Sequence, residues 1–138
     1  MALINGRGTA ASRAVLSWGA NSVAATTVVR YLFPWYHDAL APSVPFQLVM
    51  PMARVARSLY VHHGVTAGNG GVIVYALRVA GVTTALTAAL TSTGTDASDL
   101  VHAVMIPGGS LVDLVVTKAV SVGTSPGNVV VTIGLFES

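Results

Sequence analysis

The sequence predicts an all-β protein: an eight-stranded antiparallel β-sandwich of the jelly-roll type with an extended N-terminal arm. Residues 70–138 are a series of short runs rich in Val, Ile, Leu and Thr, and each run ends in a cluster of Gly, Asn, Asp or Pro. This alternation is typical of antiparallel strands joined by turns. No ordinary helix fits between these turns, and so many strands must close into a sandwich or barrel to bury one face of each sheet.

Eight apolar runs have the length of strands, and eight is the number of strands in a jelly roll. An immunoglobulin-like sandwich also fits the size, but the chain has no cysteine and lacks the Cys, Trp and Cys landmarks of that fold. With 138 residues the chain fits one domain, which we place at residues 26–138. The predicted strands begin at Thr26, Phe46, Val55, Val72, Val82, Leu100, Leu111 and Val129.

The predicted strands differ in how they expose their faces. Residues 72–79 are apolar on both faces, so we expect cover on both sides, as a subunit interface would provide. An uneven alternation near Ala56 predicts a bulge or an edge position. Residues 82–91 alternate cleanly, which predicts one buried and one exposed face. Their expected inward residues are Val82, Thr84, Leu86, Ala88 and Leu90, and the outward ones are Thr83, Thr87 and Thr91.

Charged residues are scarce: they make up 9% of the chain, against roughly 25% in a typical soluble domain, while 53% of residues are hydrophobic. A membrane span needs roughly 18 consecutive apolar residues, and the longest runs, such as 72–77 and 101–106, are strand-length. The N-terminal residues also lack the apolar core of a signal peptide. We therefore expect an obligate assembly, because permanent interfaces are more apolar than ordinary surface.

Other partners and sites find little support. The net charge of +2 rests on seven basic and five acidic residues, too few for a nucleic-acid-binding face. The absence of cysteine excludes disulfides and thiolate metal sites and suits a reducing cytoplasm. His62 and His63 are strand neighbours that point to opposite faces and cannot share a metal. Asp96 and Asp99 fall short of the roughly 6 to 8 oxygens of a calcium site, and both are ordinary turn residues.

No catalytic motif stands out. No serine lies in a G-x-S-x-G motif, and the glycines of residues 67–71 do not form a phosphate loop. We therefore expect a protein that is not an enzyme and that uses no cofactor or metal.

Residues 1–25 are predicted to form an extended arm, because they contain glycines at positions 6, 8 and 19 and no acidic residue. The arm would lie on a neighbouring subunit; a disordered terminus is the alternative. The aromatic residues of YLFPWYH, residues 31–37, are a second candidate contact, since aromatics are enriched at interfaces. A sugar platform is the alternative for them. The candidate contact residues are Leu3, Ile4, Arg7, Arg13, Leu16, Trp18, Phe33, Trp35 and Tyr36.

Residues 54–136 resemble a family of small all-β proteins from tailed bacteriophages. The resemblance lies in RSLYVHHGVTAGNGG, VIVYALRVAGVTTALTAALTSTGTDASD and VMIPGGSLVDLVVTKAVSVGTSPGNVVVTIGLF. Members of that family look like single jelly-roll domains, commonly trimeric, that serve as head decoration (cement) proteins or as fibre tips. One departure is the turn at residues 107–110, which reads PGGS where an Ala-Gly-Asp type turn is expected.

The resemblance implies a structural virion protein that binds and stabilises a phage head as a homotrimer. Its partners would be itself and the major capsid protein, on the capsid surface of a virion assembled in the host cytoplasm. No direct contact with nucleic acid or a membrane is expected. The alternative is the jelly-roll tip of a phage fibre or head spike that binds a host glycan.

Overall fold

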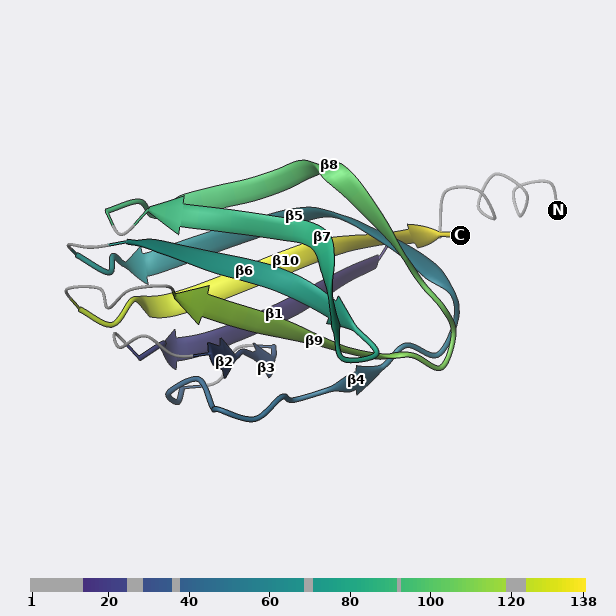
Figure 1. Cartoon of the computed structure of the whole chain (residues 1–138), viewed down its shortest axis with the longest axis horizontal. Helices are drawn as coiled ribbons and strands as arrows, with labels where there is room; N and C mark the ends of the chain where they lie inside the picture. Colours follow the sequence, from purple (N-terminus) through teal and green to yellow (C-terminus); the bar gives the residue numbers. More distant parts are fainter. Residues whose placement is uncertain (1–13, 25–28, 36–37, 69–70, 92, 119–123) are drawn as a thin grey trace, which may run out of the picture.

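The structure is a computed structural model of the chain, and it describes residues 14–24, 29–35, 38–68, 71–91, 93–118 and 124–138. These residues form ten β-strands in two antiparallel sheets that pack face to face (Figure 1). The predicted jelly-roll-like sandwich is confirmed, with ten strands where the sequence predicted eight. Among the described residues, no helix is long and apolar enough to cross a bilayer.

The first sheet, sheet A, has the strand order β3-β1-β10-β5-β8. Its centre is formed by the two long strands β5 (Arg54–Val65) and β10 (Gly127–Glu137), which pair along most of their length. β1 (Ala14–Ser22) lies on the other side of β10, and the edges are formed by β3 (Phe33–Pro34) and β8 (Asp96–Ile106). Strands far apart in the sequence are therefore neighbours, as a sandwich built from long-range pairing requires.

The second sheet, sheet B, has the order β2-β9-β6-β7, with β4 also paired to β9. Its long strands are β6 (Val72–Val79), β7 (Val82–Thr91) and β9 (Leu111–Lys118). Two short strands, β2 (Val29–Tyr31) and β4 (Leu48–Val49), pair with opposite ends of β9. The edge strand β7 lies near β8, the edge strand of sheet A (Figure 1).

The predicted arm of residues 1–25 is corrected from Ala14 onward. Strand β1 pairs with β10 from Ala14 opposite Leu135 to Ser22 opposite Gly127, so it belongs to sheet A. It is held there because Trp18 points into the core and is fully buried. Residues 1–13 lie outside the described residues.

The strand predicted at residues 26–33 is divided between the two sheets. Its described part forms β2 in sheet B and β3 in sheet A, and the fully buried Leu32 lies at the crossing. A buried side chain at this corner explains why a run rich in β-branched and aromatic residues does not give one straight strand.

Two local features of the backbone match the sequence. Ala80 and Gly81 link β6 to β7 and both have positive φ, at 50° and 80°, which is the two-residue hairpin turn that suits the twist of the strands. The pairing of β5 with β8 shifts between Arg57 and Leu59, where Ser58 has φ 60°. The bulge predicted near Ala56 is therefore present, although β5 lies inside the sheet rather than at an edge.

The alternation predicted for residues 82–91 is confirmed in the middle of β7. Leu86, Ala88 and Leu90 are buried, and Thr83 and Thr91 are exposed. Val82 is 68% exposed, so its predicted inward position is wrong; it directly follows the tight turn. The outward Thr87 and inward Thr84 are half-buried.

Strand β6 has a buried inner face and an outer face that is only partly covered. On the outer face Ala76 is 2% exposed but Val72 is 45% exposed. Ala76 lies opposite Val115, which in turn lies opposite Tyr31, so the strand's own neighbours cover this part. The predicted cover on both sides thus comes from within the chain at Ala76 and is missing at Val72.

An ion pair fixes the outer face of sheet B beside Ala76. Arg78 Nε lies 3.1 Å from Asp113 Oδ1, and Asp113 is fully buried. Arg78 also donates to the hydroxyl of Tyr31, at 2.8 Å, and Gln47 donates to Asp113 Oδ2, at 3.3 Å. Burial raises the pKa of Asp113, an effect that Gln47 and Arg78 oppose. The network ties β2 and the segment before β4 to β6 and β9.

Replacing Asp113 by alanine should destabilise the protein by about 3 kcal/mol, because Arg78 would keep a largely buried charge without its partner. The matched control is Asp96→Ala, which breaks the solvent-exposed pair with His62 and should destabilise the protein far less. Urea unfolding of the three proteins measures both values. Equal losses for the two variants would contradict the assignment.

A second polar contact joins the sheets inside the core. His63 of β5 and Tyr75 of β6 are both fully buried, and His63 Nε2 lies 2.6 Å from the Tyr75 hydroxyl. Burial lowers the pKa of His63 to about 4; the charge of His62 adds to this and Asp96 opposes it. Burial likewise raises the pKa of Tyr75, so the hydroxyl keeps its proton.

Stability should therefore fall on acidification between pH 6.5 and pH 4, because in this window unfolded His63 binds a proton and folded His63 does not. The expected loss is on the order of 3 kcal/mol, at about 1.4 kcal/mol per pKa unit. His63→Gln should flatten this part of the profile, while the exposed control His102→Gln should keep it. Urea unfolding at a series of pH values provides the measurement, and an unchanged slope in His63→Gln would refute the assignment.

Candidate functional site

The structure describes four of the nine predicted contact residues, and it separates them. Trp18 is fully buried in the core, so its predicted role in intersubunit contact is corrected to a core role. Leu16 is half-buried and packs against the core. Phe33 and Trp35 remain at the surface, and Trp35 is 67% exposed. The other predicted residues lie outside the described residues: Leu3, Ile4, Arg7, Arg13 and Tyr36.

Phe33 and Trp35 line an apolar surface pocket that we call the aromatic hollow. Its lining residues are Phe33, Pro34, Trp35 and Phe46, and its volume is about 310 Å³. The rings of Phe33 and Phe46 pack with their centroids 5.0 Å apart and their planes at 55°. An open hollow of this composition suits an apolar side chain of another molecule.

Main-chain hydrogen bonds hold the aromatic hollow in place. The Trp35 N–H donates to the Ser17 carbonyl at 2.7 Å, with Trp35 at φ 60°. The segment after it is tied to β1 as well: Asn21 donates to the Ala39 carbonyl at 3.0 Å, and Ala41 to the Ser22 carbonyl at 2.8 Å. The position of Trp35 is thus set by its main-chain hydrogen bond, while its ring stays exposed.

The hollow belongs to a larger set of exposed apolar side chains. Sixteen large hydrophobic side chains among the described residues are at least 40% exposed. Isolated cases are normal on any surface, but nine of the sixteen lie in two segments of the chain. Residues 35–52 contribute Trp35, Leu40, Val44, Phe46, Val49 and Met52, and β8 contributes Leu100, Val101 and Met105.

The fold leaves even less charge outside than the composition suggests. Asp99, Asp113 and Lys118 are buried, and Arg30 and Arg78 are half-buried. Within the described part of the chain, four charged residues are well exposed to solvent: Asp38, Arg57, Asp96 and Glu137.

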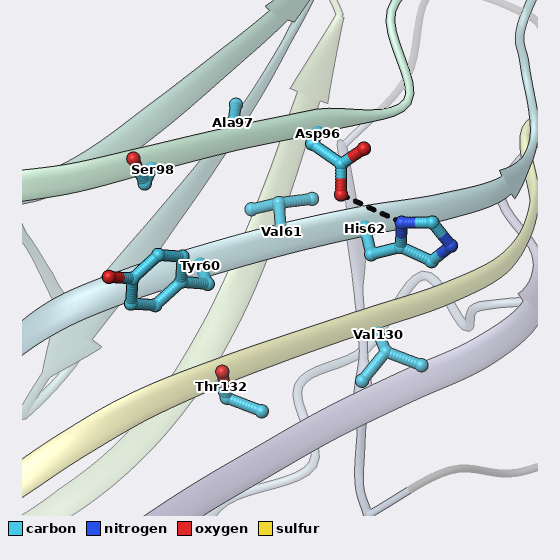
Figure 2. A pocket seen from close by; sticks show the side chains of 8 residues that line it. All are labelled: Tyr60, Val61, His62, Asp96, Ala97, Ser98, Val130 and Thr132. Carbon is cyan, nitrogen blue, oxygen red and sulfur yellow. Dashed lines mark hydrogen bonds and ion pairs between the residues drawn. The ribbon is translucent and has the colours of Figure 1, made fainter.

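The outer face of sheet A carries a second, more polar depression of about 530 Å³, which we call the sheet A groove (Figure 2). Tyr60, which is 50% exposed, and His62 project outward from β5, the strand that runs between β8 and β10. Small side chains form much of the rest, so the groove is wide and shallow. The lining residues are Tyr60, Val61, His62, Asp96, Ala97, Ser98, Val130 and Thr132.

Asp96 is fixed at the end of the sheet A groove. It accepts hydrogen bonds from the Thr95 hydroxyl, at 2.7 Å, and makes a 2.8 Å contact with His62 Nδ1 (Figure 2). These two hydrogen bonds lower the pKa of Asp96. His62 points outward while its neighbour His63 is buried, so the prediction that they face opposite ways is confirmed.

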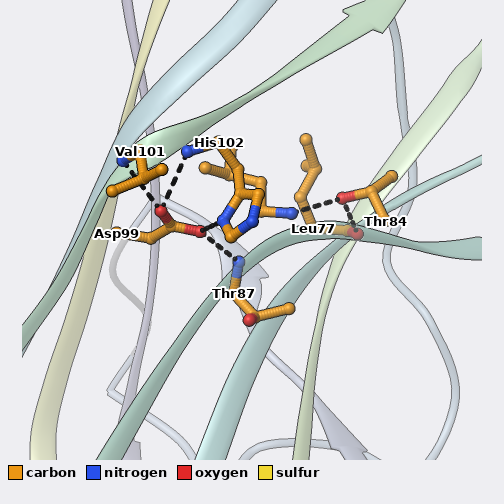
Figure 3. A network of polar contacts seen from close by, with 7 residues as sticks. Leu77, Thr84, Thr87, Asp99, Val101 and His102 are labelled. Atoms are coloured by element: carbon orange, nitrogen blue, oxygen red, sulfur yellow. Dashed lines mark hydrogen bonds and ion pairs between the residues drawn. The ribbon is translucent and has the colours of Figure 1, made fainter.

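Asp99 connects the edge strands of the two sheets (Figure 3). Its Oδ2 accepts from the Thr87 N–H of β7, at 3.0 Å, and lies 2.8 Å from His102 Nδ1. Its Oδ1 accepts from the N–H groups of Val101 and His102, both at 3.1 Å. Burial alone would raise the pKa of Asp99, but these hydrogen bonds outweigh it and hold the pKa at about 2. Asp99 thus joins the two sheets at their edge strands, β8 and β7.

Asp96 and Asp99 therefore do not converge on a common point. The part of the chain that the structure describes has no group of three or more His, Cys, Asp or Glu side chains that could hold a metal ion. Both residues lie in β8, which begins at Asp96 rather than at the predicted Leu100.

Comparisons with known proteins assign the chain to no family. No family model and no curated protein matches the chain. One solved structure that is similar to it is that of Eiger, a TNF from S. frugiperda, with a TM-score of 0.42 and 10% identity. The match covers 92% of this chain and 95% of the other.

Proposed function

We propose that this chain is a non-enzymatic structural protein whose surface is completed by other protein chains. More specifically, we propose a homotrimeric decoration protein on the head of a tailed phage, bound to the major capsid protein. The observation that carries the proposal is the aromatic hollow, where Trp35 is 67% exposed on a surface with few exposed charges.

The aromatic hollow is unfavourable as long as it faces water. Exposed apolar area costs roughly 25 cal/mol per Å² relative to burial, and large contiguous apolar patches on soluble proteins mark interaction sites. Trp35 and Phe46 are of the type that dominates binding energy when a partner covers them. The backbone of Trp35 is already fixed by its hydrogen bond to Ser17, so little main-chain entropy is lost there on binding.

The virion role rests on the resemblance of residues 54–136 to phage head proteins. In a trimer at a point where capsomers meet, the aromatic hollows would receive apolar side chains of neighbouring subunits. Several identical contacts acting together would make release slow even where each is modest. The added burial would stabilise the head against the pressure of packaged DNA.

Trp35→Ala and Phe46→Ala should each weaken attachment to phage heads about tenfold or more, because an interface hot spot contributes about 1.4 kcal/mol or more. Co-sedimentation with heads that lack this protein, built from the major capsid protein of the same virus, gives the affinity. The matched control is Tyr60→Ala, an exposed aromatic on the sheet A groove, which should bind like wild type. Wild-type attachment by the double variant would remove the aromatic hollow from the contact.

A second candidate function is glycan binding, which the sheet A groove favours. The half-exposed ring of Tyr60 can stack on the apolar face of a sugar. The fixed carboxylate of Asp96 and the hydroxyls of Ser98 and Thr132 can bond to its hydroxyl groups (Figure 2). This role would place the domain at the tip of a fibre or spike.

If glycan binding is the function, Tyr60→Ala should abolish it and Trp35→Ala should leave it intact. A glycan array with the wild-type chain and both variants separates the two roles, since Trp35→Ala should lose head attachment only. An array with no bound glycan for the wild-type chain would eliminate this second candidate.

A further inference from the structure

Four polar side chains inside the sandwich carry nitrogen atoms with no hydrogen-bond partner among the described residues. These atoms are Trp18 Nε1, Arg30 Nε, His63 Nδ1 and Lys118 Nζ. Trp18 and His63 are fully buried, Lys118 is 2% exposed and Arg30 is half-buried. We call them the cationic core cluster.

The strand register places the cluster in one part of the interior. Lys118, the last residue of β9, lies opposite Ile73, and Arg30 lies opposite Val116, two residues before Lys118. Ile73 and Val116 are core residues, so both basic side chains lie on the inner face of sheet B.

The other two members face them from sheet A. His63 lies opposite Val129 and Trp18 opposite Val131, and both valines belong to the core. His63 reaches sheet B through its contact with Tyr75, which lies opposite Val116. Both sheets therefore contribute polar atoms to the same region between them.

All four atoms can act as donors. Lysine, arginine and tryptophan nitrogens only donate. The Tyr75 hydroxyl keeps its proton, and when it donates to His63 Nε2 the ring proton of neutral His63 is on Nδ1. Among the residues that the structure describes, these four atoms have no acceptor.

None of the carboxylates of the acidic side chains provides this acceptor. It has five acidic residues. Asp96 is paired with His62, Asp99 with His102 and Asp113 with Arg78. Asp38 and Glu137 are exposed to solvent, outside the core. Burial, with the nearby charge of Arg30, lowers the pKa of Lys118 to about 8. At pH 7, below this pKa, Lys118 keeps its proton and can only donate, so it cannot serve as the acceptor.

We propose that the cationic core cluster binds a small inorganic anion between the two sheets. A monatomic ion such as chloride suits the site, because packed sheets lie only about 10 Å apart and because such an ion can accept from donors on four different strands, β1, β2, β5 and β9. The anion would accept from both sheets and offset the charges of Lys118 and Arg30. This inference does not depend on the proposed assembly role.

The test is thermal unfolding of the full chain at pH 7 with chloride varied from about 1 to 100 mM and gluconate keeping the ionic strength constant. An ion that binds only the folded state raises the midpoint with concentration. Wild type should gain several degrees over this range. Lys118→Met, which keeps the length of the side chain without its charge, should show no chloride dependence. The control Arg54→Gln, a cation at the other end of β5, should respond like wild type.

A crystal grown in bromide locates the ion directly. An anomalous peak within hydrogen-bond distance of Lys118 Nζ in wild type, absent in Lys118→Met, supports the site even if the variant's stability shifts for other reasons. Ordered water with no anomalous peak would overturn the proposal. The same holds if the midpoint responds equally to chloride in wild type and Lys118→Met.

Discussion

The structure depends on the packing of two apolar sheet faces against each other with very few charges available to the chain. Trp18, Tyr75, Leu77 and Ile133 are among the large side chains that fill the space between the sheets. Charged residues are not reserved for the outside: Asp113 is fully buried on the outer face of sheet B, and Lys118 is buried between the sheets. The outer surfaces are therefore mainly neutral and in places apolar.

The few ionic contacts lie where strands need to be joined. Arg78 and Asp113 connect β6 and β9 and attach Tyr31 and Gln47. Asp99 joins β8 of sheet A to Thr87 of sheet B. Charges used in this way do not hydrate the exterior. This shortage of exposed charge is the physical basis of the proposed assembly.

Much of this arrangement could be predicted from the sequence. Alternation placed Leu86, Ala88 and Leu90 in the core, and the turn at Ala80 and Gly81 was visible in the local pattern. The aromatic run of residues 31–37 was predicted as a candidate contact, and two of its members, Phe33 and Trp35, line the hollow.

Other features depend on contacts between distant residues. Strand β1 was missed because its partner, β10, lies at the far end of the chain, and Gly19 is a poor strand signal. Trp18 was assigned to a contact for the same reason. Strand β8 begins early because Asp96 and Asp99 find partners in His62 and Thr87, which overrides their turn propensity. The partner of Phe46 in the hollow and the isolation of Lys118 become visible only when the sheets are paired.

The central claim is that this charge-poor sandwich does not exist as a separate copy. Sedimentation velocity of the full chain, diluted from micromolar to nanomolar concentration, tests it most directly. The account predicts a species of three times the chain mass that persists on dilution. A single-copy species that stays soluble at every concentration would contradict it.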